Sequence, residues 1–286
     1  DNGNGTYGVR FYVNGAATFV TVDTNLANGG TIFNYCGSNL WASLAEKAYA
    51  QLQASGVITG NIYNYGNSWS TIGNGGAPEY ALAQITGASQ ITDFCAAKGS
   101  WTCNVYNASM KWVGGSSGLS NASVLSTLIA RIAAGDSVVL SSYTNAKDAS
   151  GKTTLVSGHA MSIYGYNAAT GNLQIRNPWG SANGQTWATT FEASLATLLA
   201  AGDVISVDNS RSGVMANVKT ASATTTSTVR SFLDDELGAL SASSIDVGAA
   251  LFAQSMATMP GDTAATTALV ASLAATPTLQ LVSPLG

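Results

Sequence analysis

The chain has 286 residues, of which 46 % are hydrophobic and 9 % are charged, so it can bury a sizeable core beneath a charge-poor surface. Its 11 Lys and Arg residues face 15 Asp and Glu residues and form no basic cluster, so we expect no nucleic-acid partner. No apolar run reaches the roughly 18 residues of a membrane span, so we expect no membrane partner either.

The elements predicted along the chain begin with a hairpin. Two β-rich runs, 7–13 and 17–22, flank Asn14-Gly15, the strongest short hairpin signal. Apolar residues at helical spacing predict helices over 39–52 and over 124–134, the second ended by Gly135. Further strands are expected over 137–141, 159–166 and 173–176, the last two paired through a turn at 167–172. Because these elements show no βαβ rhythm, the sequence predicts an α+β fold with an antiparallel sheet.

The composition of the chain changes near residues 210–228. All 6 Trp and all 11 Tyr precede residue 190, and an Ala/Ser/Thr run occupies 220–228. We therefore predict a globular core over 1–211, a linker over 212–228 and an Ala/Thr-rich extension over 229–286. Apolar residues at helical spacing after residue 229 indicate that this extension is partly helical or disordered.

The charge-poor surface, rich in Asn, Ser, Thr and Gly, is typical of secreted bacterial proteins, so we expect an extracellular or periplasmic location. The cysteines are Cys36, Cys95 and Cys103. The last two are close enough in sequence to form a short loop disulfide. A structural zinc site needs four ligands at motif spacing, which these residues and one histidine do not supply, so no metal site is predicted.

The single histidine, His159, begins one predicted strand, and Asn177 directly follows its partner strand. At neighbouring strand ends, the Asn amide oxygen can accept a hydrogen bond from one imidazole nitrogen, and the other nitrogen then faces a nucleophile. Trp179 can cover this hydrogen bond and exclude water. This pattern indicates the base and the orienting residue of a thiol hydrolase, in which an adjacent Cys attacks as thiolate.

The segments Gly158-His159-Ala160 and Asn177-Pro178-Trp179-Gly180 resemble the calpain-type cysteine peptidases. The segment 40–52 resembles the W-x-x-L-x-E-K-A-Y-A helix of that family, and the strands before it and the segment 125–140 also match in order. The likeness spans about residues 7–207. Papain-like enzymes are the nearest competitor, but Pro178 and the Glu46-Lys47-Ala48-Tyr49 run favour calpain.

The resemblance implies the second subdomain of a papain-like, calpain-type protease core, with an antiparallel sheet and flanking helices, which hydrolyses protein or peptide substrates. It implies that His159 is the general base, that Asn177 orients it and that Trp179 shields the pair. The family's nucleophilic Cys stands in a Gln-Gly-x-Cys-Trp-like stretch, and none occurs in these 286 residues. We therefore expect a processed precursor whose separate N-terminal fragment carries the Cys and is a partner of this chain.

Two alternatives stay open. Cys36 precedes a predicted helix whose dipole favours a thiolate, which would give a papain-like or amidase-type thiol hydrolase. A catalytically inactive secreted binding module on the same fold is the other. The resemblance also raises calcium binding, but the segment 180–187 lacks the acidic residues that a calcium site needs. No cofactor is therefore predicted, and no calcium ligand is assigned.

Overall fold

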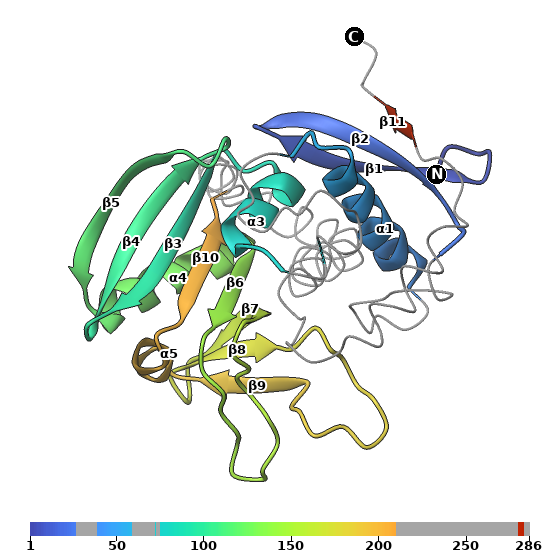
Figure 1. Ribbon diagram of the computed structural model, residues 1–286. Coiled ribbons are helices and arrows are strands. Elements are labelled where there is room, and N and C mark those ends of the chain that lie inside the picture. The colour runs from blue at the N-terminus through green and yellow to red at the C-terminus, as the bar shows by residue number, and fades with distance from the viewer. Residues whose placement is uncertain (27–38, 59–71, 73–74, 210–279, 283–286) are drawn as a thin grey trace, which may run out of the picture.

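The computed structural model describes residues 1–26, 39–58, 72, 75–209 and 280–282, which form two antiparallel sheets and four helices (Figure 1). The smaller sheet contains β1 (Thr6–Val13), β2 (Ala16–Asp23) and β11 (Gln280–Val282). The larger sheet has the order β5-β4-β3-β10-β6-β7-β8-β9. Its strands, in chain order, are β3 (Gln90–Ala97), β4 (Ser100–Asn107), β5 (Trp112–Leu119), β6 (Val138–Ser142), β7 (His159–Asn167), β8 (Asn172–Arg176), β9 (Thr190–Ala193) and β10 (Val204–Asp208). The helices are α1 (Leu40–Ala54), α3 (Pro78–Thr86), α4 (Asn121–Ala134) and α5 (Leu195–Ala201).

The predicted α+β class with an antiparallel sheet is confirmed, because every paired strand in the described residues runs antiparallel to its neighbour. The helices α1 and α4 and the strands β6, β7 and β8 lie where the sequence places them. The linker 212–228 and the predicted helical parts of the extension lie outside the described residues. Within 229–286 the structure describes β11 alone, which pairs with β2 and brings Leu281 opposite Val20.

The β1–β2 hairpin follows directly from its turn. Asn14 and Gly15 both adopt a positive φ, 53° and 83°, which is the conformation that a two-residue hairpin turn of type I′ needs. The helix α1 packs across this hairpin, and Phe11 and Tyr49 meet with their ring centroids 5.6 Å apart. Lys47 of α1 donates to the Asp23 carboxylate and to the Asn25 carbonyl oxygen, 2.7 Å away, which ties the helix to the end of β2.

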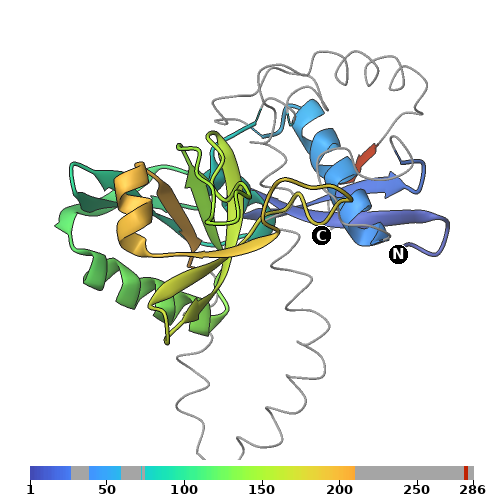
Figure 2. The same ribbon diagram turned by 90° about the horizontal axis from the view of Figure 1, so that it is seen from below.

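The larger sheet carries a hydrophobic cluster on each face. On one face, Ile91, Val139 and Ala160 pack with residues of α1, α3 and the hairpin. On the other face, neighbouring residues such as Leu140 and Met161 pack with α4 and α5. Side chains alternate between the faces of a strand, so a single run such as 138–142 serves both clusters. Figure 2 shows the hairpin and α1 at one end of the molecule and α4 and α5 at the other.

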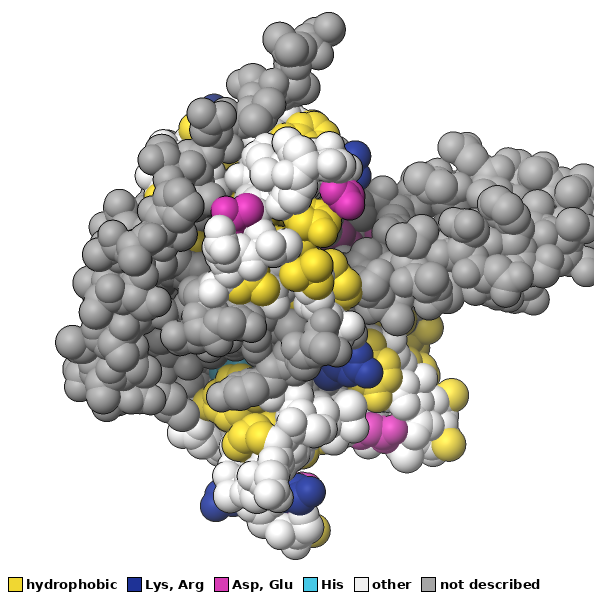
Figure 3. Space-filling view, turned by 90° about the vertical axis from the view of Figure 1, so that its right-hand side faces the viewer, with side chains coloured by type: hydrophobic (Ala, Val, Ile, Leu, Met, Phe, Trp, Pro, Cys, Tyr) yellow, Lys and Arg dark blue, Asp and Glu magenta, His cyan; other side chains and the backbone are white. Residues whose placement is uncertain are grey.

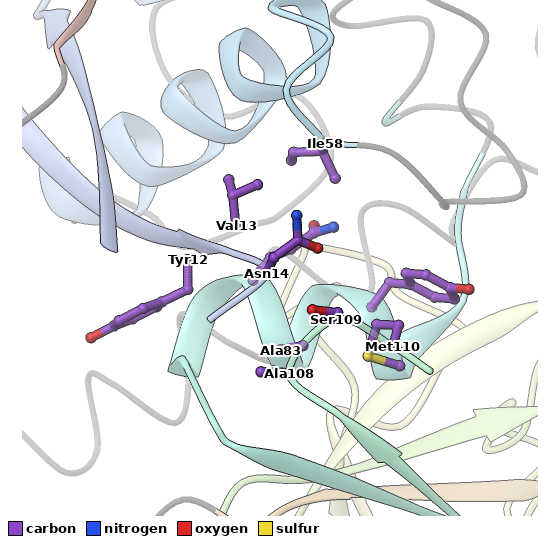
Figure 4. A pocket seen from close by; sticks show the side chains of 10 residues that line it. Tyr12, Val13, Asn14, Ile58, Ala83, Ala108, Ser109 and Met110 are labelled. Atoms are coloured by element: carbon purple, nitrogen blue, oxygen red, sulfur yellow. The ribbon is translucent and has the colours of Figure 1, made fainter. Parts of the chain in front are cut away.

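A small cavity of about 30 Å³ lies where the hairpin turn, α3 and the β4–β5 turn meet. Figure 4 shows Asn14, Ser109 and Met110 around it, with Ala83 from the helix. One water needs at least about 10–15 Å³ of such volume, so this cavity has room for one or two waters and not for a peptide side chain. The cavity therefore marks the junction between the two sheets and is not a candidate functional site.

The surface carries few charged side chains, as the charged fraction of 9 % predicts. In the coloured part of the face that Figure 3 shows, charged side chains are few and lie among neutral and hydrophobic ones. None of the helices in the described residues is long and apolar enough to cross a membrane.

A buried acid lies between the larger sheet and α3. Asp93 of β3 is 4 % exposed, on the same strand face as Ile91, and its Oδ1 has no hydrogen-bond partner among the described residues. Burial, and next the charge of Glu79 in the first turn of α3, raise the pKa of Asp93 to about 8. Asp93 is therefore protonated at neutral pH, which keeps a second negative charge out of this junction.

This protonation predicts how stability depends on pH. Between about pH 4 and pH 8, Asp93 keeps its proton in the folded state and loses it in the unfolded state, so the free energy of unfolding falls as the pH rises. We expect Asp93→Asn to remove the Asp93 part of that fall, on the order of 5 kcal/mol for a pKa raised from 3.8 to about 8, measured by urea unfolding across this range. The exposed Asp148→Asn is the control, because hydrogen bonds lower the pKa of Asp148 and its titration lies below this range. An Asp93→Asn protein as pH-sensitive as the parent would contradict this assignment.

Candidate active site

The two predicted site residues, His159 and Asn177, meet at one end of the β7–β8 pair. His159 is the first residue of β7, and Asn177 follows the last residue of β8. The strands are antiparallel with Ser162 opposite Arg176, so the start of β7 lies beside the end of β8. The separation of 18 residues is thus two strand lengths and the turn between them.

Local backbone contacts fix both strand ends. Gly158 adopts a φ of +73°, and its N–H donates to the Ser142 carbonyl oxygen at 2.8 Å, which turns the chain into β7 directly before His159. On the other side, the Asn177 N–H donates to the Thr189 carbonyl oxygen, also at 2.8 Å. Backbone hydrogen bonds to neighbouring segments therefore fix Gly158, which directly precedes His159, and Asn177.

One side-chain hydrogen bond defines the geometry of the site. His159 Nε2 lies 3.0 Å from Asn177 Oδ1, and both side chains are 1 % exposed. The Trp179 N–H donates to the same Oδ1 at 3.0 Å. An atom that accepts from a backbone N–H is the amide oxygen, and an oxygen that only accepts requires Nε2 to be the donor. The neutral imidazole therefore carries its proton on Nε2, and Nδ1 presents a lone pair.

Trp179 packs against His159, and Trp187 packs against Trp179. The Trp179 ring lies 4.6 Å from the His159 ring between centroids, at an interplanar angle of 37°. Trp187 meets Trp179 edge to face at 5.6 Å and donates from its indole Nε1–H to the Gly180 carbonyl oxygen at 2.9 Å. Because these rings limit the access of water, the bond between His159 and Asn177 keeps its strength in a low-dielectric environment.

Burial controls the charge of His159. Desolvation lowers its pKa from 6.5 to about 4, and the hydrogen bond that Nε2 donates to Asn177 opposes part of this shift. The imidazole is therefore neutral at pH 7. Its Nδ1 is buried and has no hydrogen-bond partner among the described residues. A buried, unprotonated nitrogen without a partner is chemically a base positioned to accept a proton from a neighbouring group.

Cys95 and Cys103 do not lie at this site. They belong to β3 and β4, and two strands of the sheet, β10 and β6, separate β3 from β7, which is a distance of roughly 14 Å. Burial, and next the charge of Asp93, raise the pKa of both thiols, that of Cys95 to about 11. Neither residue is suited to attack as a thiolate at neutral pH.

Cys95 and Cys103 do not form the disulfide that their sequence spacing allows. Both are free thiols in the structure. Cys95 lies opposite Thr102 in the β3–β4 ladder and Cys103 lies opposite Phe94, so the two side chains point to opposite faces of the sheet. Sequence separation alone suggested that they could meet. Cys36, the third cysteine, lies outside the described residues.

The described residues contain no cluster of side-chain metal ligands. Calcium takes several carboxylate and carbonyl oxygens, and no group of three or more His, Cys, Asp or Glu in the described part of the chain could hold a metal ion. The loop after Trp179 is cross-linked by neutral groups instead, with the Gln185 amide donating to the Trp187 carbonyl oxygen at 2.8 Å.

With this geometry, the comparisons with known proteins identify the family. The model of the calpain family cysteine proteases matches residues 1–195, which is more than half of the chain. The chain therefore belongs to the calpain family of cysteine proteases, and its general function is that of a cysteine peptidase. No curated protein and no solved structure matched the chain.

Sequence reasoning missed the part of the site that Trp187 contributes. In the sequence, the segment 180–187 stands out only for its lack of acidic ligands, and nothing in its spacing assigns a role to its tryptophan. The edge-to-face contact with Trp179 depends on how the loop folds back, which sequence spacing does not show. A second tryptophan eight residues after Trp179, in a loop rich in Gly, Ser and Asn, was the available signal.

The tautomer and the pKa of His159 can be measured directly. In nitrogen NMR of the imidazole, we expect Nε2 protonated and Nδ1 unprotonated at pH 7, with the ring staying neutral to about pH 5 because of its burial. As the pH falls, His159 binds a second imidazole proton at a higher pH in the unfolded state than in the folded state. The free energy of unfolding therefore decreases as the pH falls from about 6.5 to 4. We expect Asn177→Ala to give a mixture of tautomers. A His159 that titrates at its ordinary pKa in the folded protein would contradict this account.

Proposed function

We propose that this chain is part of a calpain-like cysteine endopeptidase, in which His159 is the general base and then the general acid, Asn177 orients it and Trp179 shields their hydrogen bond. The observation that carries the proposal is the bond from Nε2 to Asn177 Oδ1, which leaves Nδ1 unprotonated. Membership of the calpain family supplies the reaction class.

The proposed reaction proceeds in two stages. First, a cysteine thiol gives its proton to Nδ1 of His159, and the sulfur attacks the peptide carbonyl carbon. A C–S bond forms, the C–N bond breaks, and the leaving amine takes the proton from the imidazolium. Water then gives a proton to Nδ1 and attacks the thioester carbon. A C–O bond forms, the C–S bond breaks, and the leaving thiolate takes the proton from the imidazolium, which releases the carboxylic acid and restores the thiol. In both stages Asn177 accepts from Nε2–H, so the ring keeps one orientation while Nδ1 gains and loses its proton.

The low pKa of His159 fits this role when a thiol is beside it. A thiolate near Nδ1 would favour the protonated imidazole, because an opposite charge within about 4–6 Å stabilises it. The thiolate–imidazolium pair therefore forms only where both groups are present. Without a thiolate, burial keeps the imidazole neutral.

The nucleophile belongs, in this proposal, to a cysteine on a separate N-terminal fragment of a processed precursor that stays bound to this chain. The positions and raised pKa values of Cys95 and Cys103 support a nucleophile from elsewhere. The charge-poor composition supports a secreted, bacterial enzyme acting on protein or peptide substrates. The second subdomain of a papain-like core is the proposed architecture of the larger sheet with its flanking helices.

Substitutions in the active enzyme test the roles of these residues. We expect His159→Gln to lower kcat/KM for a peptide substrate by at least about 100-fold, because the general base is lost. Asn177→Ala should lower kcat by about tenfold or more with little change in KM, since it orients the base and does not touch the substrate. Asn183→Ala, on the exposed loop nearby, is the control and should behave as the parent. Full activity of His159→Gln would refute the proposed mechanism.

Intact-mass analysis of the active enzyme tests the source of the cysteine. We expect a second polypeptide with a reactive thiol beside the 29.0 kDa chain. Activity from the 29.0 kDa chain alone, abolished by Cys36→Ala, would contradict the separate fragment and favour the alternative nucleophile.

A further inference from the structure

The segment 177–189 between β8 and β9 forms a closed loop. Its ends meet where the Asn177 N–H donates to the Thr189 carbonyl oxygen at 2.8 Å. In Figure 1 this segment is the yellow loop that leaves β8 and returns to β9. A compact loop whose ends are close and whose own side chains pack inside it is an Ω-loop, and such loops are frequently functional. Because the loop contains Asn177 and Trp179, its internal contacts determine the surroundings of the proposed base.

One side-chain amide, that of Gln185, links the two limbs of this loop. Its Oε1 accepts from the Ala182 N–H at 2.7 Å, in the limb that leaves β8. Its Nε2 donates to the Trp187 carbonyl oxygen at 2.8 Å and to the Thr189 hydroxyl oxygen at 3.1 Å, in the limb that returns to β9. A backbone N–H can only donate and a carbonyl oxygen can only accept, so these partners fix which end of the amide faces which limb.

The first connection from Gln185 to the site passes through Thr189. The hydroxyl group of Thr189 accepts from Gln185, and the carbonyl oxygen of Thr189 accepts from the Asn177 N–H. The same hydroxyl group lies 3.4 Å from the carbonyl oxygen of Gly180, in the turn directly after Trp179. Gln185 therefore holds the residue that sets the backbone of Asn177 at the end of β8.

The second connection passes through Trp187. Gln185 donates to the Trp187 carbonyl oxygen, and the Trp187 ring packs edge to face on Trp179 with the centroids 5.6 Å apart. Trp179 then reaches the site twice, because its N–H donates to Asn177 Oδ1 and its ring lies on the ring of His159. Both supports of the His159 hydrogen bond, the backbone of Asn177 and Trp179, are thus connected to one amide.

The rest of the loop offers little other support. Residues 181–184 are exposed, and Gln185 is the first partly buried residue after them. No acidic or basic residue occurs in the segment 180–189, so no ion pair within the loop can take over this task. The shape of the loop therefore depends on neutral hydrogen bonds, of which one side chain makes three.

We propose that Gln185 is a positioning residue for the cysteine peptidase reaction, whose side-chain amide holds Asn177 and Trp179 so that the Asn177 oxygen stays on Nε2 of His159. This inference rests on the proposed function, because it concerns the base of the same site. Gln185 acts through other residues, so its loss misorients the base and leaves substrate binding little changed.

Three variants separate the hydrogen bonds of Gln185 from its size and from charge. Gln185→Glu keeps the size and an acceptor oxygen but removes both N–H donors, so a carboxylate oxygen faces the Trp187 carbonyl oxygen. Gln185→Leu removes all three hydrogen bonds without adding a charge. Asn183→Asp is the matched control, because it makes the same amide-to-carboxylate change at an exposed position of the same loop.

Nitrogen NMR of His159 in the 286-residue chain tests the proposal without catalysis. We expect Nε2 alone to be protonated in the parent and in Asn183→Asp, and both Gln185 variants to give a mixture of tautomers. Urea unfolding identifies a variant that fails to fold, and the other Gln185 variant then decides the test. A single tautomer in the folded Gln185 variants, or a mixture in Gln185→Glu but not in a folded Gln185→Leu, would overturn the proposal.

A double-mutant cycle in the active enzyme distinguishes positioning from a merely structural role. We expect Gln185→Glu to lower kcat about tenfold and to change KM less than about twofold. In the Asn177→Ala background we expect the same substitution to lower kcat less than about twofold further, because residues that act through one interaction are not additive. An equal loss of kcat in both backgrounds would overturn the proposal.

The positioning role and the peptidase mechanism fail in distinguishable ways. Full activity of His159→Gln would overturn the proposed mechanism, whereas the tautomers of the Gln185 variants are read without any reaction. A single tautomer in those variants, in an enzyme that His159→Gln inactivates, would overturn the role of Gln185 alone.

Discussion

The hydrogen bond between His159 Nε2 and Asn177 Oδ1 is the interaction on which the proposed chemistry of this protein depends. It assigns the imidazole proton to one nitrogen and leaves the other with a lone pair. It does so because the amide oxygen is fixed by a second donor, the backbone N–H of Trp179. A side-chain amide that could rotate would offer its NH2 group as readily as its oxygen and would specify neither tautomer.

The fold supports this bond from two directions. The antiparallel pairing of β7 and β8 brings the two residues together, and the backbone hydrogen bonds of Gly158 and Asn177 set the strand ends. The tryptophans then keep water away, so the same burial that strengthens the bond also lowers the pKa of His159 to about 4. A neutral base is thereby available at pH 7, and an adjacent thiolate is needed before it becomes charged.

Much of the fold was predictable where local signals were strong. Asn14-Gly15 specified the hairpin, and the apolar spacing around Leu44 and Leu52 specified α1, because these signals act over a few residues. The strands β3, β4, β5, β9 and β10 and the short helices α3 and α5 were not predicted. β10 joins β3 to β6 in the sheet although it comes last among them in the chain, and β5 contains three glycines in eight residues. Such strands are specified by their partners more than by their own residues.

The site shows the same division. His159, Asn177 and Trp179 could be selected from motifs, because each motif is contiguous. The contact of Trp187 and the opposite orientations of Cys95 and Cys103 could not, because each depends on register or on a loop fold. The difference is physical: residue identity fixes which groups are available, and long-range pairing fixes which of them meet.

The most direct test of the central claim is to look for the cysteine that His159 activates in the proposed mechanism. The active enzyme is treated with a peptide-based electrophile that alkylates thiolates, and the modified residue is located by mass spectrometry. The account predicts one modified cysteine, other than Cys95 and Cys103, whose labelling is lost in His159→Gln and retained when Cys95 and Cys103 are replaced by Ser. Labelling of Cys95 or Cys103, or labelling that persists in His159→Gln at the same rate, would contradict it.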